Sequence, residues 1–432
     1  MPSTLQGIAN KAKCQKKYRF LNLYTMLNEE YLKDSWRYLN KTASNGIDGV
    51  SAKDYEQNLE ENIEGLVERL KRKNYKAKLV RRQYIPKGNG KMRPLGILTV
   101  EDKLLQTAVA RILQAIYEQD FQESSFGYRP GKGAKDAVKE LTYQLQYGWY
   151  GYVVEADIKG FFDNINHDWL IRMLEQRVND RPFLGLIKKW LKAGILDTDG
   201  KILNPLTGTP QGGIVSPVLA NIYLHYVLDL WFEKLVKKRF KGECSLCRYA
   251  DDFVCSFQYK KEALQFYREL PKRFSKFGLR LAKDKTQVMS FSKFRMEEKT
   301  SFNFLGFEFR WGKNRKGKAQ IKRRTSRCKL RKSLANFTEW CKQIRKIGLK
   351  KLLKKLNPKL RGYYNYYGVI GNYASLKEFT YQAKRILLKW INRRGQRKSY
   401  NWKGFETMLK HHNIIKPRIT EKRNYQLTLA FC

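Results

Sequence analysis

Acidic residues are scarce in this chain of 432 residues. The sequence has 87 Lys and Arg residues against 40 Asp and Glu, which gives a formal net charge of +47 at pH 7. Charge repulsion on this scale destabilises a compact protein unless polyanions bind to it, so the composition argues against a protein that works alone. Nucleic acid is the polyanion that we expect as its partner.

Long apolar runs and paired cysteines are also missing. No run approaches the ~20 apolar residues of a membrane span, and residues 1–20 are basic without the apolar core of a signal peptide. These absences predict a soluble cytoplasmic protein. The seven cysteines are an odd number and are scattered, which argues against a disulfide framework. Cys244 and Cys247 have zinc-knuckle spacing, but no second Cys or His pair follows at a suitable distance, so reduced thiols are the favoured interpretation.

The basic excess is concentrated near the C-terminus. Residues 310–432 contain 35 basic and 4 acidic residues. Aromatic residues run through the same segment, where they could stack on bases or form a core. A hydrophobic content of 42% and this length allow two or three packed domains.

Two adjacent carboxylates lie between short apolar runs, in residues 247–256, which read CRYADDFVCS. This pattern predicts a β-hairpin that presents Asp251 and Asp252 at a tight turn. Alone, such a pair is most often a solvated turn. Because adjacent carboxylates repel each other, a fold that keeps them together can use a divalent cation such as Mg²⁺ to offset the repulsion.

A third carboxylate ends a buried strand about ninety residues upstream. Residues 152–162 read YVVEADIKGFF, which predicts a strand that ends at Asp157 and is broken at Gly160. Three carboxylates at the ends of two neighbouring strands can hold two Mg²⁺ ions roughly 3.5–4 Å apart, as in polymerases. The sequence therefore predicts a nucleic-acid polymerase.

Helix and strand signals alternate along the chain. The first ~75 residues look helical, with one apolar face, and residues 83–95 read as a hairpin. Residues 208–213 form a flexible loop, after which Ser216 and Pro217 offer an N-cap and a first-turn proline to a helix. Beyond Trp311 the pattern predicts a small basic helical bundle. The residues of the N-terminal apolar face are Tyr55, Leu59, Ile63, Leu66, Val67 and Leu70.

Five motifs in a fixed order resemble the bacterial group II intron-encoded reverse transcriptases, also called maturases, in a version that lacks the HNH endonuclease region. They are the segment from Tyr84 to Leu105, SFGYRP at 125–130, ADIKGFFD at 156–163, GTPQGG at 208–213 and YADD at 249–252. The resemblance runs from about residue 40 to about residue 402. It implies an α+β fold of the right-hand polymerase type, with fingers and a palm built on antiparallel sheet and a helical thumb or maturase domain. The implied segments are a helical N-terminal extension (1–75), fingers and palm (76–309), thumb or maturase domain (310–400) and a basic tail (401–432).

The resemblance also implies roles for individual residues. Asp157 and Asp251 would share both metal ions, Ile158 would belong to the same metal site, and Asp252 would be a less direct third carboxylate. The cofactor implied is a pair of Mg²⁺ ions, with Mn²⁺ as a substitute. The nucleotide would contact Lys87, Arg93, Phe162, Gln211, Gly212 and Lys285, and the primer and template would contact Tyr249, Phe304, Leu305 and Gly306.

Simpler interpretations of several of these residues stay open. Lys87 and Arg93 could be surface charges, Lys285 a surface lysine instead of a proton donor to pyrophosphate, and Phe162 a core residue instead of a block to a 2′-hydroxyl. The aromatic residues at 304–307 could also be core. A lysine-rich stretch at 346–359 could contact phosphates or form one solvated helix face.

The expected function is RNA-directed DNA synthesis, with binding of intron RNA, assistance to its splicing and copying into cDNA during retrotransposition. The expected partners are intron RNA, an RNA template with a DNA primer, dNTPs and target DNA. One alternative is a domesticated or defence-associated relative without an intron, and another is a non-catalytic RNA-binding splicing factor. Many relatives carry paired Cys motifs in an HNH region, whereas this chain has only His411 and His412 after Trp402, so we expect no endonuclease.

Overall fold

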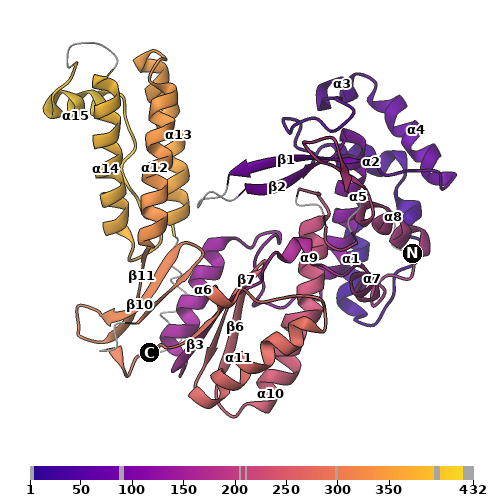
Figure 1. Cartoon of the computed structure of the whole chain (residues 1–432), viewed down its shortest axis with the longest axis horizontal. Coiled ribbons are helices and arrows are strands. Elements are labelled where there is room, and N and C mark those ends of the chain that lie inside the picture. The colour runs from indigo at the N-terminus through magenta and orange to yellow at the C-terminus, as the bar shows by residue number, and fades with distance from the viewer. Residues whose placement is uncertain are drawn as a thin grey trace. The chain divides into compact units, whose positions relative to one another are not determined.

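The chain folds into two compact units in a computed structural model (Figure 1). The structure describes residues 4–86, 92–203, 206–209, 212–296, 300–393 and 399–421. Unit one comprises Met1–Ala137 and Tyr152–Val288, and unit two comprises Val138–Gly151 and Met289–Cys432. The four segments predicted from the sequence are a finer division and stay a prediction.

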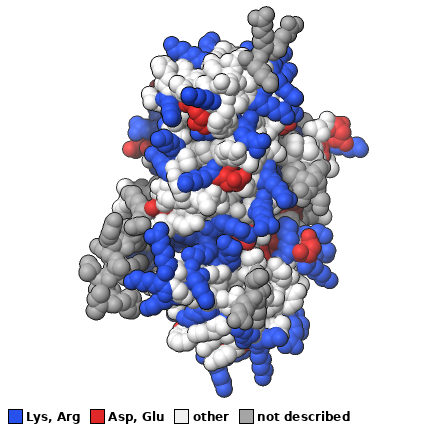
Figure 2. Space-filling model, turned by 90° about the vertical axis from the view of Figure 1, so that its left-hand side faces the viewer, with Lys and Arg blue, Asp and Glu red and all other residues white. Residues whose placement is uncertain are grey.

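The basic excess lies at the surface. Figure 2 shows one face on which Lys and Arg side chains far outnumber acidic ones. Among the described residues, only a few Lys and Arg side chains are buried, and they are Lys103, Arg129, Arg177, Arg248 and Arg323. A surface of this kind fits the predicted polyanionic partner.

The N-terminal segment is helical, as predicted. Its helices are α1 (Leu5–Cys14), α2 (Glu29–Trp36), α3 (Ala52–Gln57) and α4 (Leu59–Lys71). The predicted apolar face is mostly buried, but it belongs to two helices, because the chain leaves helical geometry at Asn58 (φ −119°, ψ 44°). A capping box between Ser51 and Asp54 starts α3 and satisfies two backbone N–H groups that a helix start leaves free.

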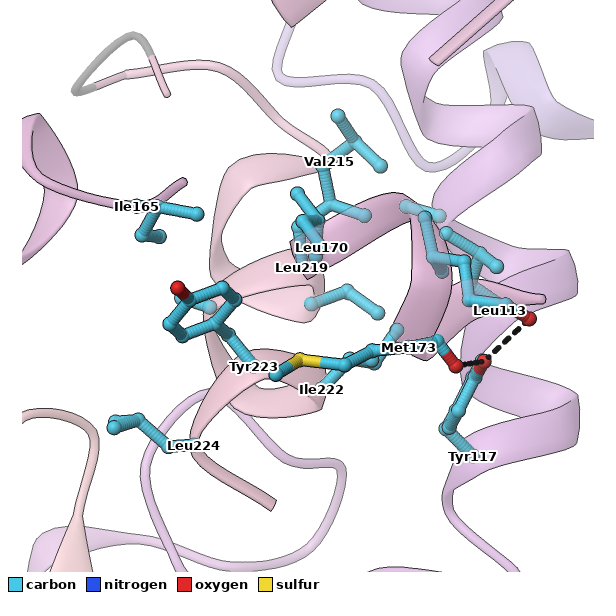
Figure 3. Packing of buried hydrophobic residues seen from close by; sticks show 14 of the residues in the cluster. Leu113, Tyr117, Ile165, Leu170, Met173, Val215, Leu219, Ile222, Tyr223 and Leu224 are labelled. Atoms are coloured by element: carbon cyan, nitrogen blue, oxygen red, sulfur yellow. Dashed lines mark hydrogen bonds between the residues drawn. The ribbon is translucent and has the colours of Figure 1, made fainter. Parts of the chain in front are cut away.

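The large core of unit one gathers around α5 (Val100–Tyr117). Apolar side chains from α7 (His167–Leu174) and α9 (Ser216–Leu224) belong to the same buried cluster as those of α5 (Figure 3). The Tyr117 hydroxyl is fully buried and donates to the Leu174 carbonyl at 3.1 Å, so its polar end has a partner inside the core. The remaining helices of unit one are α8 (Arg181–Leu191), α10 (Lys237–Arg239) and α11 (Lys260–Ser275).

The start of α9 differs from the prediction. Ser216 already lies inside the first turn, and Val215 precedes the helix with helical backbone angles and no side-chain cap. Pro217 falls in the first turn, where its missing N–H costs nothing. Beyond α9 the helix widens into two π-helical segments, His225–Asp229 and Phe232–Val236.

Two sheets organise unit one. The predicted hairpin is β1 (Val80–Pro86) and β2 (Met92–Ile97), which pair antiparallel in a sheet of order β2-β1-β4-β5, with β4 at Ile195–Leu196 and β5 at Ile202–Leu203. The second sheet has the order β6-β7-β3-β8, with bounds β3 Tyr152–Asp157, β6 Cys244–Tyr249, β7 Asp252–Phe257 and β8 Gln287–Ser290. Strands β6, β7 and β3 pair antiparallel, so both predicted strands with carboxylates lie in one sheet.

Unit two combines a small sheet with helices. The sheet has the order β11-β10-β9, formed by β9 (Ser301–Phe304), β10 (Phe307–Lys313) and β11 (Ala319–Thr325). The helices are α12 (Arg327–Ile344), α13 (Leu349–Tyr367), α14 (Tyr373–Asn392) and α15 (Trp402–His411). The prediction of helix directly beyond Trp311 is therefore wrong for the residues up to Thr325, which form a strand hairpin. Among the described residues, no helix combines the length and the apolar character that crossing a membrane needs.

A short segment from the middle of the chain completes unit two. Helix α6 (Ala134–Tyr147) ends in this unit, and the Gln146 side chain both donates a hydrogen bond to β11 and accepts one from it. Its amide donates to the Ala319 carbonyl at 3.1 Å and its oxygen accepts from the Ile321 N–H at 2.9 Å. Gln146 thereby occupies the edge of this sheet, where backbone groups would otherwise lack partners.

Candidate active site

Asp157 and Asp252 face each other across two adjacent strands. Asp157 ends β3, Asp252 begins β7, and the register of the antiparallel pair places them opposite each other. Tyr249, the last residue of β6, is opposite Asp252 in the other ladder, so residues 250–251 form the two-residue turn between β6 and β7. Ala250 adopts φ +55°, which is uncommon for a residue with a side chain. The predicted hairpin and the predicted gathering of the three carboxylates are present.

Two of the three carboxyl groups, those of Asp251 and Asp252, have raised pKa values. Burial raises the pKa of Asp251, and the neighbouring Asp157 adds to the effect. Burial raises the pKa of Asp252 to about 7, with further contributions from Asp157, Asp251 and Glu155. The ionised forms of Asp251 and Asp252 are thus disfavoured here, and a bound cation would relieve this cost.

A lysine stands beside this cluster. The ammonium group of Lys285 forms an ion pair with Asp157, and the hydrogen bond from that contact raises the pKa of the lysine. Lys285 is more than half exposed, so the contact is a solvent-accessible one of modest strength. The predicted nucleotide-site lysine therefore lies at the carboxylates.

The donor set suits Mg²⁺ that is shared with a substrate. Among the described residues, no group of three or more His, Cys, Asp or Glu side chains is arranged closely enough to hold a metal by itself. Mg²⁺ usually takes one or two carboxylates together with phosphate oxygens and water, so a complete protein cage is not required. Asp157 and Asp252 in register, with Asp251 next to them, fit that partial set. Ile158 follows Asp157 and is buried, in a β-bridge with Leu281.

Gly208 and Thr209, the described residues at the start of the loop, pack against the turn that follows β3. Gly160 takes the left-handed conformation (φ +57°) and lets the chain turn into a short 3₁₀ segment, Phe161–Asp163. The Thr209 N–H donates to the Phe162 carbonyl at 2.8 Å, so loop and turn are joined directly. Phe161 is core, whereas Phe162 is only partly buried and packs on the edge of that core. Phe162 therefore has a part of its ring available to a ligand.

Gly212 approaches the β1–β2 hairpin very closely. Its φ is +117°, and a Cβ added there would lie 2.4 Å from the Gly96 carbonyl oxygen on β2. No side chain fits in that space, so glycine is required both for the backbone angle and for the approach. Gln211 and Lys87, the other predicted residues of these two loops, lie outside the described residues. Arg93 is exposed on β2, and its positive charge acts on Asp251 by lowering its pKa against the effect of burial.

Three of the four predicted primer and template contacts, Phe304, Leu305 and Gly306, lie in unit two, whereas Tyr249 ends β6 in unit one. Leu305 and Gly306 have φ values of +50° and +82° and form the two-residue turn between β9 and β10. Phe304 and Phe307 on either side are buried, as the core interpretation expects, and the role of this turn at the primer stays a prediction. Of the nearby tyrosines, Tyr364 and Tyr367 are buried and Tyr366 is exposed.

Cys244 and Cys247 do not form a metal site. They lie three residues apart on β6, and side chains at that spacing in a strand point to opposite faces. Cys247 is buried and its thiol donates to the Ala137 carbonyl at 3.5 Å. The favoured interpretation as reduced thiols in a strand agrees with this geometry.

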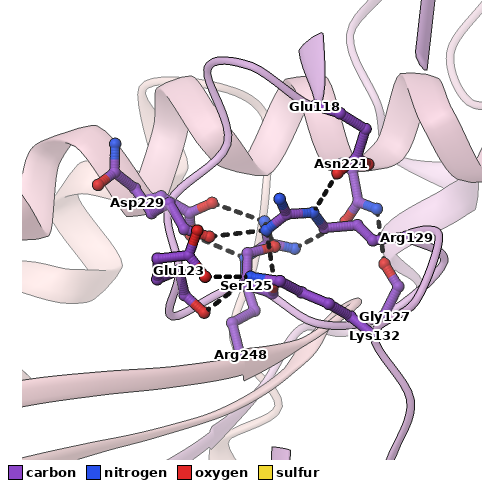
Figure 4. A network of polar contacts seen from close by, with 10 residues as sticks. Glu118, Glu123, Ser125, Gly127, Arg129, Lys132, Asn221, Asp229 and Arg248 are labelled. Atoms are coloured by element: carbon purple, nitrogen blue, oxygen red, sulfur yellow. Dashed lines mark hydrogen bonds and ion pairs between the residues drawn. The ribbon is translucent and has the colours of Figure 1, made fainter. Parts of the chain in front are cut away.

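The sequence did not predict the buried residues that support the turn between β6 and β7. Arg248 lies on β6, and its side chain is completely buried. It donates hydrogen bonds to Asp229, Asn221 and Ser125 (Figure 4). A basic residue inside an otherwise apolar strand was the available signal, but its partners are 19 to 123 positions away in the sequence. Tyr128, which is exposed with φ +58°, was not among the predicted site residues either.

Comparisons with known proteins agree with this architecture. The family model "Reverse transcriptase (RNA-dependent DNA polymerase)" matches residues 85–309, and the model "Group II intron, maturase-specific domain" matches residues 316–406. The group II intron-encoded protein LtrA of Lactococcus lactis subsp. cremoris is 32% identical, over 77% of this chain and 67% of LtrA. The chain belongs to the group II intron reverse transcriptase and maturase family.

This reverse transcriptase has further relatives of different extent. Protein YkfC of Escherichia coli is 30% identical over 69% of this chain and 84% of YkfC. An uncharacterised 91 kDa protein in a cob intron of Schizosaccharomyces pombe is 41% identical over 40% of this chain and 21% of that protein.

The family confirms the predicted fold class and activity. The sheets of unit one, with antiparallel pairs β1–β2, β3–β7 and β6–β7, and the helical region that follows are those of the right-hand polymerase fold. The protein is an RNA-directed DNA polymerase with a maturase domain, which implies nucleic-acid substrates, intron RNA among them, and a role in intron splicing.

Proposed function

We propose that this reverse transcriptase copies its intron RNA into DNA with Asp157, Asp251 and Asp252 as the carboxylates of a two-magnesium centre. The observation that carries the proposal is the register of β3 against β7, which sets Asp157 opposite Asp252 at the turn that presents Asp251. The substrates proposed are dNTPs and a DNA primer on an RNA template, with target DNA as the acceptor of the intron. We place this activity in the bacterial cytoplasm and keep the four-segment division of the chain.

In this mechanism the protein would hold the metal ions, orient the nucleotide and neutralise the charge of its phosphates. Two Mg²⁺ ions bound at the carboxylates would activate the primer 3′-hydroxyl and stabilise the leaving pyrophosphate. Arg93 on the exposed hairpin would draw in the triphosphate, since a guanidinium can bind two phosphate oxygens at once. The contact with Asp157 raises the pKa of Lys285 and so keeps a positive charge at Nζ beside the carboxylates, where it would neutralise the leaving pyrophosphate.

The alternatives differ in measurable ways. A non-catalytic splicing factor would bind intron RNA and extend no primer, and it would have no use for three crowded carboxylates. A relative detached from any intron would extend primers without preference for intron RNA, and the DNA around its gene would encode no folded ribozyme.

Primer extension on an RNA template tests the polymerase and the role of Phe162. The wild-type protein should incorporate dNTPs with Mg²⁺ and discriminate strongly against rNTPs, because the ring leaves no room for a 2′-hydroxyl. Phe162→Val should narrow this preference by about tenfold or more, as expected for ~1–3 kcal/mol of steric discrimination. The measurement is single-nucleotide incorporation kinetics for matched dNTP and rNTP pairs.

Phe161→Val is the matched control. It removes the same volume from the neighbouring core position, so it should lower thermal stability while leaving the dNTP-to-rNTP ratio unchanged. An unchanged dNTP-to-rNTP ratio in Phe162→Val would mean that Phe162 serves only as a core residue. A wild-type protein that binds RNA but extends no primer would overturn the polymerase proposal.

We propose that α13 supplies an RNA-binding face. Lys350, Lys351, Lys354 and Lys355 are all exposed on one side of this helix, while leucines of the same helix are buried on the other side. The cluster at 323–327 is a weaker candidate, because Arg323 is buried in an ion pair with Glu421 and Arg324 binds Glu308 with two hydrogen bonds. The exposed lysines have their charge available to phosphates.

Neutralising the four α13 lysines to Gln should weaken RNA binding and reduce its salt dependence. For every phosphate that the variant no longer neutralises, the slope of log affinity against log salt should become shallower by about 0.7–0.9. Filter binding from low to high salt measures the slope, and slower extension should recover partly at high template concentration. Neutralising Lys260, Lys261, Lys272 and Lys276, which are exposed on α11 in unit one or directly after it, changes the net charge equally and serves as the control. A wild-type slope in the α13 variant would make these lysines a merely solvated helix face.

A further inference from the structure

Arg248 is bound through all of its donors. Its five guanidinium N–H groups match five hydrogen bonds: two to the Asp229 carboxylate (2.8 and 2.6 Å), and one each to the Asn221 side-chain oxygen (3.0 Å), the Ser125 hydroxyl (2.7 Å) and the Ala250 carbonyl (3.0 Å). Arg248 and Asp229 are both 0% exposed. We call Arg248, Asp229, Asn221 and Ser125 the Arg248 brace.

The brace ends on the turn that carries the catalytic carboxylates. Ala250, whose carbonyl accepts from Arg248, directly precedes Asp251 and Asp252 and has the uncommon φ of +55°. A strained residue of this kind keeps its conformation only when its surroundings impose it. The hydrogen bond from Arg248 is one such constraint.

The loop at 124–127 supplies the second constraint on the same residue. A Cβ added to Gly127 would lie 2.5 Å from the Ala250 nitrogen, so the loop backbone touches the turn. Asn221 fixes this loop and the arginine together, because its amide donates to the Gly127 carbonyl at 2.7 Å while its oxygen accepts from Arg248. Backbone bonds from Arg248 to Ser124 and from Phe126 to Arg248 join the loop to β6 as well.

The π-helical segment after α9 aims Asp229 at the arginine. Asn221 and Asp229 are eight residues apart, and in an α-helix of 3.6 residues per turn such positions differ by about 80° around the axis. A π-helix bonds five residues apart and turns less at each residue, which brings the two side chains toward one face. The π-helical segment thus allows Asp229 and Asn221 to contact Arg248 together.

Stability alone does not explain this arrangement. Burying an ion pair costs about as much desolvation as its attraction returns, and apolar replacements are often equally stable, so such pairs are better explained by the conformation that they specify. Here that conformation is the turn of the active site.

We propose that the Arg248 brace consists of positioning residues that set Asp251 and Asp252 for metal binding. This inference rests on the proposed two-magnesium function. None of the four side chains needs to touch substrate. Loss of the brace should therefore raise the Mg²⁺ requirement and lower kcat, with little change in KM for dNTP or in RNA affinity.

The test is the double variant Arg248→Met, Asp229→Leu, which removes both charges and leaves neither one unpaired. It should keep a wild-type melting temperature within a few degrees, raise the half-maximal Mg²⁺ concentration about tenfold and lower kcat about 10- to 100-fold. Asn221→Ala, which removes an uncharged side chain and leaves the Arg248–Asp229 ion pair in place, is the second variant in case the first does not fold, and it should shift the Mg²⁺ dependence in the same direction. Arg248→Lys keeps the charge but not the five-donor fork, so it should rescue stability more than Mg²⁺ affinity.

Arg177→Met is the matched control for removal of a buried arginine. Arg177 pairs with Asp120 and bonds main-chain carbonyls of the N-terminal segment, so its replacement should lower the melting temperature without moving the Mg²⁺ midpoint. Wild-type Mg²⁺ dependence and kcat in both folded brace variants would overturn the brace and leave the polymerase proposal standing. Absence of extension by the wild-type protein would instead reject the polymerase proposal itself.

Discussion

Replacing Asp251 or Asp157 with Asn is expected to abolish DNA synthesis. Either substitution removes a carboxylate from the proposed metal centre, and metal stabilisation of the transition state is worth several kcal/mol. At about 1.36 kcal/mol per tenfold, the rate of extension should fall by ~10³ or more. RNA affinity should stay close to wild type, because phosphate contacts lie elsewhere. Primer extension on an RNA template with Mg²⁺ measures the loss. Retention of even a tenth of the wild-type rate would contradict the assignment of these carboxylates as metal ligands.

The Asp251→Asn protein should fold at least as well as wild type. Because burial and Asp157 raise the pKa of Asp251, its ionised form is less favourable in the folded chain than in the unfolded chain. A neutral amide of the same shape removes that repulsion. Thermal melting checks this point, and Asp168→Asn, which changes a carboxylate in the first turn of α7, is the control that should change neither rate nor stability.

Gly212→Ala is expected to cause the second-largest loss. The added Cβ would meet the Gly96 carbonyl at 2.4 Å, and φ +117° is accessible to almost no other residue. The loop must therefore move away from β2, which displaces the predicted nucleotide contacts. We expect kcat/KM for dNTP to fall about 100-fold in primer-extension kinetics, since small misplacements at reacting groups cost this much.

Gly200→Ala separates backbone strain from displacement. Gly200 also has a positive φ, +82°, but nothing lies within 4 Å of its added Cβ. This control should lose about 1 kcal/mol of stability and keep its activity. Equal activity of the two variants would show that the approach of Gly212 to β2 does not matter for the nucleotide.

The parts of the site that follow from local pattern were predictable. Alternating apolar residues around Asp157 and around Asp251 predict two strands, and the Asp pair between them predicts the turn. The sequence did not reveal that Lys285 pairs with Asp157 across 128 positions, or that Arg248 finds Asp229 in a π-helical segment, because such contacts depend on how distant elements meet.

The missed hairpin of β10 and β11 has a specific cause. In β11 every second residue points inward, but one of those inward positions is Arg323. Its charge is matched by Glu421, which lies 98 residues further along. A buried arginine hides the period of two that identifies a strand, so the pattern of this basic stretch favours a helix.

The discontinuity of unit two has a consequence for synthesis on the ribosome. Gln146 is translated 173 residues before Ala319, the residue to which it donates. At a translation rate of ~5–20 residues per second, β11 is synthesised roughly 9–35 s after the end of α6. During that interval the nascent chain exposes Tyr147 and Trp149, both of which stay largely exposed in the finished protein, so this stretch tolerates water without its partners. A fragment that starts at Met289 lacks residues 138–151 of unit two, so we expect separate expression of the maturase region to be less stable than expression with that peptide supplied in trans.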